Sequence, residues 1–215
     1  MKSNRNRVRG GAFVSRRAAA KLLTAAPLLF LSKAARAIPT PSAMEGPFYP
    51  SPSMRYRDTD NDLVKIAGRV EKAGGEVVQL RGRVLDRNGQ PIAGARVEIW
   101  QCDVNGRYLH TGDNGGRRAR RDTGFQGFGF DVTDRNGEYA FRTIKPVPYP
   151  GRTPHIHVKV LHGNSELTTQ FYLAEHPLNR QDFLFRRMSQ TEQDAVKMHF
   201  ARSAAGQVAS VDIRL

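Results

Sequence analysis

Residues 80–100 read LRGRVLDRNGQPIAGARVEIW, and this stretch decides the fold class. Apolar and polar side chains alternate over 80–85, which is the period-two pattern of a half-buried strand. The Asn-Gly pair at 88–89 then supplies a favoured sequence for a tight hairpin turn. The alternation resumes toward residue 100 and places Val97 and Ile99 on one face. The stretch therefore predicts two short strands joined by a turn.

The same pattern recurs along the rest of the chain, with a second Asn-Gly turn at 136–137. The alternating runs give about seven strands, at 80–85, 95–100, 128–133, 139–144, 155–161, 167–173 and 209–215. Short strands at this spacing, with turn signals between them, are typical of an antiparallel sandwich. We therefore predict an all-β protein with an antiparallel β-sandwich core formed by residues 79–215.

Two further segments do not follow the strand pattern. Residues 38–78 are predicted to form an extended N-terminal arm, because prolines stand at 39, 41, 47, 50 and 52. Ser189 and Glu192 have the spacing of a helix capping box. Val196 and Phe200 follow at helical spacing, so we predict one short C-terminal helix.

The formal net charge of +14 would suit a nucleic-acid binder, but it is concentrated at the N-terminus. Residues 1–37 contain nine Lys and Arg residues and no Asp or Glu. Without that segment, 25 basic residues face 20 acidic ones, a net charge of +5. The arginine cluster at 117–121 has no aromatic residues interleaved with it. We therefore expect no nucleic-acid partner.

Residues 1–37 have the organisation of an export signal. A twin arginine at 16–17 precedes an apolar run over 18–31, and the Ala-Arg-Ala at 35–37 suits a signal-peptidase site. This order is typical of a twin-arginine (Tat) signal peptide, and a Sec signal fits the same residues. The apolar run is shorter than the roughly 20 residues that span a bilayer. We expect a periplasmic or otherwise exported protein that starts near Ile38 and has no membrane span.

The strongest local signal for chemistry is the pair His155 and His157. Residues two apart in a strand share a face, so both imidazoles project together and can bind one metal. Tyr149 lies six residues before the pair in a proline-rich turn, and Tyr108 follows a strand end. Each of these residues taken alone also suits an ordinary surface or core position.

Five segments, in consistent order from about Glu45 to Tyr172, resemble the intradiol ring-cleavage dioxygenases. They are 45–50 (EGPFYP), 82–108 with its end WQCDVNGRY, 133–146 (TDRNGEYAFRTIKP), 149–157 (YPGRTPHIH) and 167–172 (LTTQFY). No single segment is specific to that family, but the ordered set is.

The resemblance implies that Tyr108, Tyr149, His155 and His157 bind one non-haem Fe(III). The donor types agree with this ligand set, because phenolate is a hard, anionic oxygen donor that favours ferric iron. Ferrous oxygenases use two histidines and one carboxylate instead. The implied substrates are a small-molecule catechol and O2. The implied product is of the muconate type, formed by cleavage between the two hydroxylated carbons.

The resemblance also implies three catalytic roles. Tyr149 leaves the iron and receives a substrate proton. Arg152 stabilises carbanionic character on the bound catecholate. Gln170 lies near the ring-cleavage centre. A surface salt bridge for Arg152 and a strand–strand hydrogen bond for Gln170 are the alternatives.

Two departures from the family pattern concern the substrate pocket. The stretch between the second tyrosine and the arginine, which is longer in several relatives, shrinks here to residues 149–152, so one pocket wall should be more open. Phe130 stands where relatives carry a polar or basic residue. Tyr49 is expected to border the pocket. The ring substituent of the substrate is therefore left open.

A non-catalytic function is the alternative. Residues 82–99 also resemble transthyretin-like and carboxypeptidase-regulatory-like modules, which would make the protein an exported β-sandwich binding module. Such a module has no reason to carry two histidines, two tyrosines and Arg152 in this order. The sequence does not choose among catechols, or among a monomer, a homo-oligomer and a complex with a second subunit type.

Overall fold

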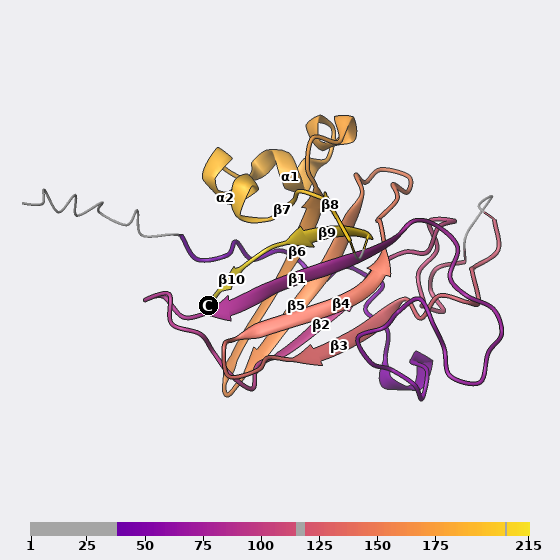
Figure 1. Ribbon diagram of the computed structural model, residues 1–215. Coiled ribbons are helices and arrows are strands. Elements are labelled where there is room, and N and C mark those ends of the chain that lie inside the picture. Colours follow the sequence, from indigo (N-terminus) through magenta and orange to yellow (C-terminus); the bar gives the residue numbers. More distant parts are fainter. Residues whose placement is uncertain (1–37, 115–118, 205) are drawn as a thin grey trace, which may run out of the picture. The chain divides into compact units, whose positions relative to one another are not determined.

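The computed structural model describes residues 38–114, 119–204 and 206–215. The leader predicted for residues 1–37 lies outside these residues. The described part folds into two β-sheets with an apolar core between them (Figure 1). In these ranges no helix has the length and apolar character needed to cross a membrane.

The described strands are β1 (Val77–Leu85), β2 (Arg96–Trp100), β3 (Phe128–Val132), β4 (Glu138–Ile144), β5 (His155–His162), β6 (Ser165–Leu173), β7 (Lys197–Met198), β8 (Ala201–Ser203), β9 (Gly206–Ser210) and β10 (Ile213–Arg214). The helices are η1 (Pro52–Met54), η2 (Pro177–Arg180), α1 (Phe183–Arg187) and α2 (Gln190–Ala195). Each strand predicted up to residue 173 is present, with its ends shifted by up to three residues.

One sheet has the order β10-β1-β9-β8 with β4 also paired to β1, and the other has the order β3-β2-β5-β6-β7. The hairpin neighbours are antiparallel, whereas β9 and β10 pair with β1 in parallel and β7 pairs with β6 in parallel. The all-β sandwich is therefore confirmed, with mixed sheets. Parallel pairing needs a long connection between strands, and the segment that contains α1 and α2 supplies it before β7, β9 and β10.

Alternation along β2 and β5 decides which side chains enter the core. Val97 and Ile99 of β2 and the apolar residues of β5 pack between the sheets with Leu80 and Phe141 of the other sheet. This confirms the predicted faces. Since successive side chains point to opposite faces, Trp100 and the β5 histidines lie on the outer face of the β3-β2-β5-β6 sheet.

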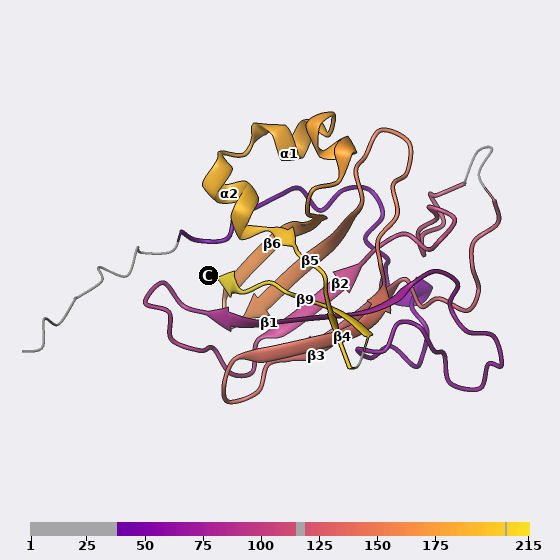
Figure 2. The ribbon, with the colours of Figure 1, turned by 45° about the horizontal axis from the view of Figure 1, so that its top comes forward.

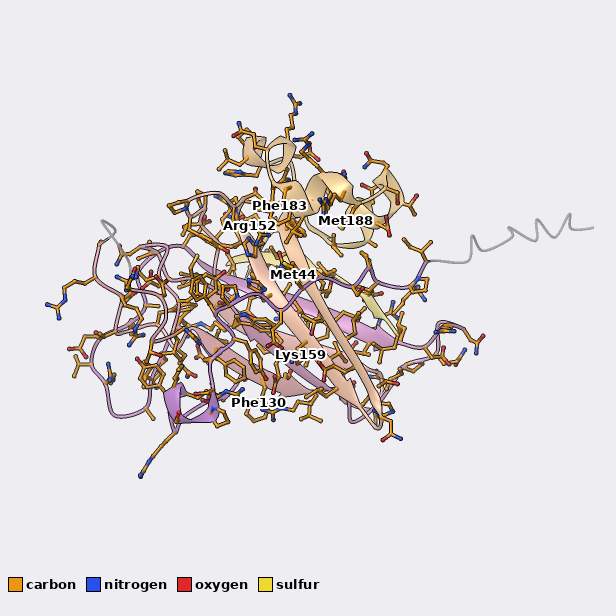
Figure 3. All side chains as sticks on the ribbon, turned by 180° about the vertical axis from the view of Figure 1, so that it is seen from behind. Met44, Phe130, Arg152, Lys159, Phe183 and Met188 are labelled. Atoms are coloured by element: carbon orange, nitrogen blue, oxygen red, sulfur yellow. The ribbon has the colours of Figure 1, made fainter. Side chains whose placement is uncertain are left out.

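The N-terminal arm covers that outer face. The backbone oxygen of Met44 accepts a hydrogen bond from Gln170 Nε2 at 3.2 Å. Tyr49 packs edge-on against Trp100, with ring centroids 4.9 Å apart. Figure 3 views the molecule from behind and labels Met44 of the arm and Lys159 of β5. Residues on this face are thus buried although they lie outside the sandwich core.

Helices η2, α1 and α2 follow β6 and lie together on one side of the sheets (Figure 2). The capping box of α2 is confirmed, because Ser189 Oγ accepts from Glu192 N while the Glu192 carboxylate accepts from Ser189 N. Helix α1 was not predicted. It begins after Asp182, whose side chain accepts hydrogen bonds from the first turn.

Candidate metal centre

His155 and His157 lie at the start of β5, which is the middle strand of its sheet. Both are buried, with 1% and 3% of their surface exposed, and their Nε2 atoms are 3.2 Å apart. Trp100, the β2 partner of His157, stacks on the His157 ring at a centroid distance of 4.8 Å. Strand pairing on both sides therefore holds the two imidazoles next to each other.

The hydrogen bonds of the two histidines differ. His155 Nδ1 is 2.6 Å from the backbone oxygen of Thr153, so Nδ1 carries the hydrogen and Nε2 keeps a lone pair. His157 Nδ1 is buried and has no hydrogen-bond partner among the described residues. A buried polar atom without a partner is uncommon in a folded protein and calls for an explanation.

Tyr108 reaches the histidines from the loop that follows β2. Its backbone N–H donates to Asp113 Oδ2 at 2.8 Å, and Asp103 Oδ1 accepts from the backbone N–H of Arg107 at 2.9 Å. These carboxylates fix the loop. The Tyr108 side chain is 1% exposed, and its hydroxyl oxygen is 3.5 Å from His155 Nε2.

Tyr149 comes from a tight turn in which Arg152 N donates to the Tyr149 backbone oxygen at 3.0 Å. The Tyr149 ring lies 5.5 Å from the Tyr108 ring and 5.6 Å from the His155 ring, between centroids. The four residues that the sequence singled out as ligands are therefore neighbours, although three different segments carry them.

All four donor groups are uncharged in this environment. Burial lowers the pKa of His155 to about 3, and the positive charge of Arg152 adds to the effect. Burial also holds the pKa of His157 well below its usual value. Burial raises the pKa of Tyr108 well above its usual value, and it raises the pKa of Tyr149 against the opposing charge of Arg152. A bound cation would reverse the effect on the phenols, since positive charge favours phenolate.

This donor set fits a ferric ion. A cation beside the two Nε2 atoms, which are 3.2 Å apart, would accept a lone pair from each of them, and His157 would then carry its hydrogen on Nδ1. In the residues that the structure describes, no group of three or more His, Cys, Asp or Glu side chains could hold a metal. A metal here would therefore depend on the two tyrosines, whose phenolates are hard donors suited to Fe(III).

Arg152 and Gln170 contact each other beside the four donor residues. Arg152 Nη2 donates to Gln170 Oε1 at 2.6 Å, and Arg152 Nε donates to Asp182 Oδ2 at 2.8 Å. The Tyr172 hydroxyl donates to the same Gln170 oxygen at 3.0 Å. Arg152 is therefore neither at the surface nor a free cation, and Gln170 is not limited to strand-strand contacts.

The shortened turn borders a hollow of about 330 Å³. The residues that line it include Tyr149, Gly151 and Arg152 of the turn, and Leu178 and Gln181 from the segment after β6. An open pocket wall was expected at this turn.

Tyr49 of the arm and Phe130 of β3, the other two residues that the sequence analysis related to the pocket, are not among the residues that line this hollow. The Tyr49 hydroxyl donates to buried Glu98 at 2.6 Å. This bond holds the Tyr49 ring in its edge-on contact with Trp100. Phe130 is covered by the guanidinium of Arg96, 3.6 Å from the ring centroid.

Sequence reasoning missed Asp182, which is 1% exposed and contacts Arg152 directly. Burial by itself raises the pKa of Asp182, but the hydrogen bonds from Arg152 and from the backbone N–H groups of Phe185 and Thr153, with the charge of Arg152, together outweigh burial and lower it. The available signal was an aspartate immediately before the apolar run at 183–185, which is typical of a helix N-cap.

Comparisons with known proteins agree with one another. The family model described as Dioxygenase matches residues 44–215. The protocatechuate 3,4-dioxygenase beta chain of Burkholderia cepacia is 36% identical over 151 residues, which cover 66% of this chain and 63% of that protein. The catechol 1,2-dioxygenase of Candida albicans is 30% identical over 182 residues, covering 76% of this chain and 55% of that protein. The chain thus spans less than two thirds of the length of these relatives.

A solved structure supports the same assignment. The dioxygenase domain of a dioxygenase and carbohydrate-binding protein fusion from Streptomyces sp. SirexAA-E superposes with a TM-score of 0.62 at 32% identity, covering 83% of this chain and 98% of that one. Since the family model covers most of the chain and the relatives carry dioxygenase names, the alternative of a non-catalytic module is not supported. The chain belongs to the intradiol ring-cleavage dioxygenase family.

Proposed function

We propose that this protein is a non-haem Fe(III) intradiol dioxygenase that cleaves a catechol between its two hydroxylated carbons. Both atoms of O2 enter a muconate-type product. The observation that supports this most is the convergence of two neutral, buried imidazoles with two buried phenols, beside an imidazole nitrogen that has no partner in the described chain.

The proposed ligands are Tyr108, Tyr149, His155 and His157. When bound there, ferric iron supplies the Lewis acidity and redox character that make a catecholate ring reactive toward dioxygen. Thr153 fixes the tautomer of His155 through its backbone oxygen, so the nitrogen that faces the other donors is the basic one. Trp100 stacks on His157 and, with the arm above it, keeps water from this side of the site.

Tyr149 and Arg152 are proposed to act on the substrate, and Gln170 is proposed to assist catalysis beside them. As a phenolate, Tyr149 Oη would take a proton from a catechol hydroxyl, because burial raises the pKa of this phenol against the opposing charge of Arg152. Arg152 places positive charge next to the reacting ring carbons. Gln170 holds that guanidinium through Oε1, and the backbone oxygen of Met44 holds the Gln170 amide.

Purified protein should contain stoichiometric iron and show a visible phenolate-to-iron charge-transfer band that shifts when catechol is added. Oxygen uptake measured over a panel of substituted catechols should identify substrates, and loss of the band on reduction or chelation should remove the activity. A colourless protein with stoichiometric zinc, or no oxygen uptake with any catechol by iron-loaded protein, would contradict the proposal.

We also propose that the protein is exported through the twin-arginine route. Arg16 and Arg17 support this proposal, because the receptor of that route reads the arginine pair. Changing both to Lys should abolish the periplasmic protein, measured by cell fractionation. Undiminished periplasmic protein would favour the Sec route and leave the enzymatic proposal unaffected.

A further inference from the structure

Asp182 connects helix α1 with the loop that carries Arg152. Its Oδ2 accepts from Arg152 Nε at 2.8 Å and from the backbone N–H of Thr153 at 3.1 Å. Its Oδ1 accepts from the backbone N–H groups of Leu184 and Phe185, both at 3.1 Å. One carboxylate oxygen therefore holds the loop, and the other caps the helix.

These contacts fix the plane of the Arg152 guanidinium. Asp182 accepts from Nε at 2.8 Å, and Gln170 accepts from Nη2 at 2.6 Å. The guanidinium is rigid and planar, so two anchors on different nitrogens leave it little freedom to rotate. The Arg152 side chain is 13% exposed and that of Asp182 is 0% exposed, so water competes little for either group.

A second set of bonds keeps the metal-site backbone in place without Asp182. The Thr153 hydroxyl donates to Asn179 Oδ1 at 2.6 Å, and Asn179 Nδ2 donates to the backbone oxygen of Leu173 at 3.0 Å. Thr153 therefore keeps an anchor when Asp182 changes, and its bond from His155 Nδ1 is retained. In the described structure, the hydrogen bond from Arg152 Nε to Asp182 has no second acceptor of this kind to replace it.

We propose that Asp182 is a positioning residue that aims the Arg152 guanidinium at the substrate, an inference that rests on the function proposed above. A buried ion pair is seldom a net source of stability compared with apolar residues of similar size. Orientation is therefore the effect that this buried pair supplies here. Asp182 is not one of the proposed metal ligands, and it acts through Arg152.

The test is Asp182→Asn in the full chain, together with Asp182→Ser. Both replacements keep a side-chain oxygen that suits a helix N-cap and lose the carboxylate oxygen that faces Arg152. The iron content, the visible band and its shift with catechol should be retained. We expect kcat to fall about 10- to 100-fold, as is usual when a residue that orients a functional group is removed, with little change in KM.

Ser189→Ala is the matched control. It removes the N-cap of α2 but contacts neither Arg152 nor Gln170 in the described structure. The melting temperature should fall by about 2–4 °C while kcat stays that of the parent. A similar loss of kcat in Ser189→Ala would mean that any weakening of these helices slows turnover, and the positioning role would be overturned.

A double-mutant cycle with Arg152→Leu gives the decisive result. If Asp182 acts only through Arg152, then Arg152→Leu/Asp182→Asn should have the same kcat as Arg152→Leu. The double variant should also melt at a higher temperature than Arg152→Leu, which leaves a buried carboxylate without its cation. The inference would be overturned if the losses of kcat in the two single variants multiplied in the double variant. It would also be overturned if the double variant were less stable than Arg152→Leu. The second comparison remains available if the single Asp182 variants do not fold.

The outcomes separate this inference from the proposed function. If the iron-loaded parent cleaves no catechol, the proposed function fails first. If the parent turns over and Asp182→Asn or Asp182→Ser keeps kcat within about twofold of it, only the positioning role is wrong.

Discussion

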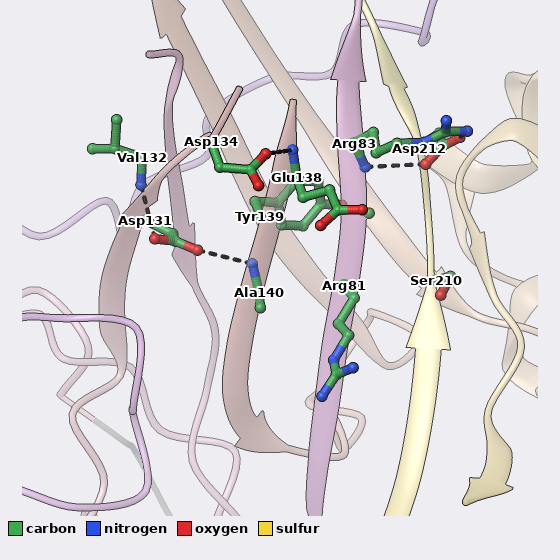
Figure 4. Close-up of a pocket in the computed structure, with 11 residues that line it drawn as sticks. Arg81, Arg83, Asp131, Val132, Asp134, Glu138, Tyr139, Ala140, Ser210 and Asp212 are labelled. Carbon is green, nitrogen blue, oxygen red and sulfur yellow. Dashed lines mark hydrogen bonds and ion pairs between the residues drawn. The ribbon is translucent and has the colours of Figure 1, made fainter. Parts of the chain in front are cut away.

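Two regions on the outer surfaces of the sheets differ in how their polar groups are satisfied. A groove of about 540 Å³ on the β1–β4 side is lined by charged residues, among them Arg83, Asp131 and Asp134 (Figure 4). Its aspartates accept hydrogen bonds within the fold. Asp134 Oδ1 accepts from two backbone N–H groups of its own turn, and Asp131 Oδ2 accepts from the backbone N–H of Ala140 at 2.8 Å.

The proposed metal centre shows the opposite arrangement. It contains few charges, yet it buries neutral donor groups next to one another and leaves one imidazole nitrogen without a partner among the described residues. Burying polar groups in this state costs free energy unless a ligand compensates for it. In this protein, the size and charge of a cavity therefore indicate the functional site less well than buried polar groups without hydrogen-bond partners in the fold.

The largest effect is expected from Tyr108→Phe, which removes an anionic donor that no described neighbour replaces. The ferric site and its colour should be lost, and catechol-dependent oxygen uptake with them. Metal analysis and the visible spectrum measure this directly. The matched control is Tyr139→Phe, which deletes an equally buried phenol that donates to the Val211 backbone oxygen in the sandwich core. Retention of full iron by Tyr108→Phe would show that the ligand set is wrong.

A somewhat smaller effect is expected from Arg152→Leu. No donor to the metal is lost, so iron and its band should remain, and the band should still shift with catechol. Turnover should fall by roughly two to three orders of magnitude, the usual cost of removing one preorganised electrostatic group. Arg152→Lys keeps the charge but loses the planar fork, so it should restore only part of the rate.

Stopped-flow spectra and oxygen uptake separate binding from turnover in these variants. Near-normal oxygen uptake by Arg152→Leu with every catechol that the parent cleaves would make Arg152 a structural residue. The ligand set could then still stand.

The sequence predicts local features of this chain well. Alternation placed Val97 and Ile99 in the core, and it placed His155 and His157 together on the opposite face. These assignments succeed because the side-chain direction in a strand depends only on residue parity. The capping box at Ser189 succeeds for a similar reason, since both its members lie within one helical turn.

Contacts between distant segments could not be predicted in this way. Asp182 and Arg152 are 30 residues apart, and nothing in either neighbourhood specifies the other as partner. The parallel pairing of β9 and β10 with β1 also depends on how the chain returns after the helices. The grouping of Tyr108 and Tyr149 with the histidines followed from the family resemblance, because no periodicity relates these loops to β5.

On the groove side, Gly82→Ala tests whether the region is structural. The chain between β9 and β10 crosses Gly82 so closely that an added Cβ would lie 1.8 Å from the Val211 backbone oxygen. The backbone must shift to relieve this contact, at a cost of about 1–3 kcal/mol in the free energy of unfolding. Urea denaturation should show this loss, while turnover per bound iron stays that of the parent. An unchanged unfolding midpoint would mean that the crossing is not as close as described.

The smallest effect is expected from Arg83→Ala, which breaks an ion pair with Asp212 at 2.8 Å. The two side chains are 51% and 36% exposed, so water and salt screen the pair. The free energy of unfolding should change by less than about 1 kcal/mol, and by less still at high salt. Asp212→Ala should cost more, because Asp212 Oδ1 also accepts from the backbone N–H of Arg83 at 3.0 Å. Urea denaturation at two salt concentrations and oxygen uptake measure both variants. Loss of turnover in Arg83→Ala would contradict the contrast between the two regions, because the groove would then take part in function although the fold uses its aspartates.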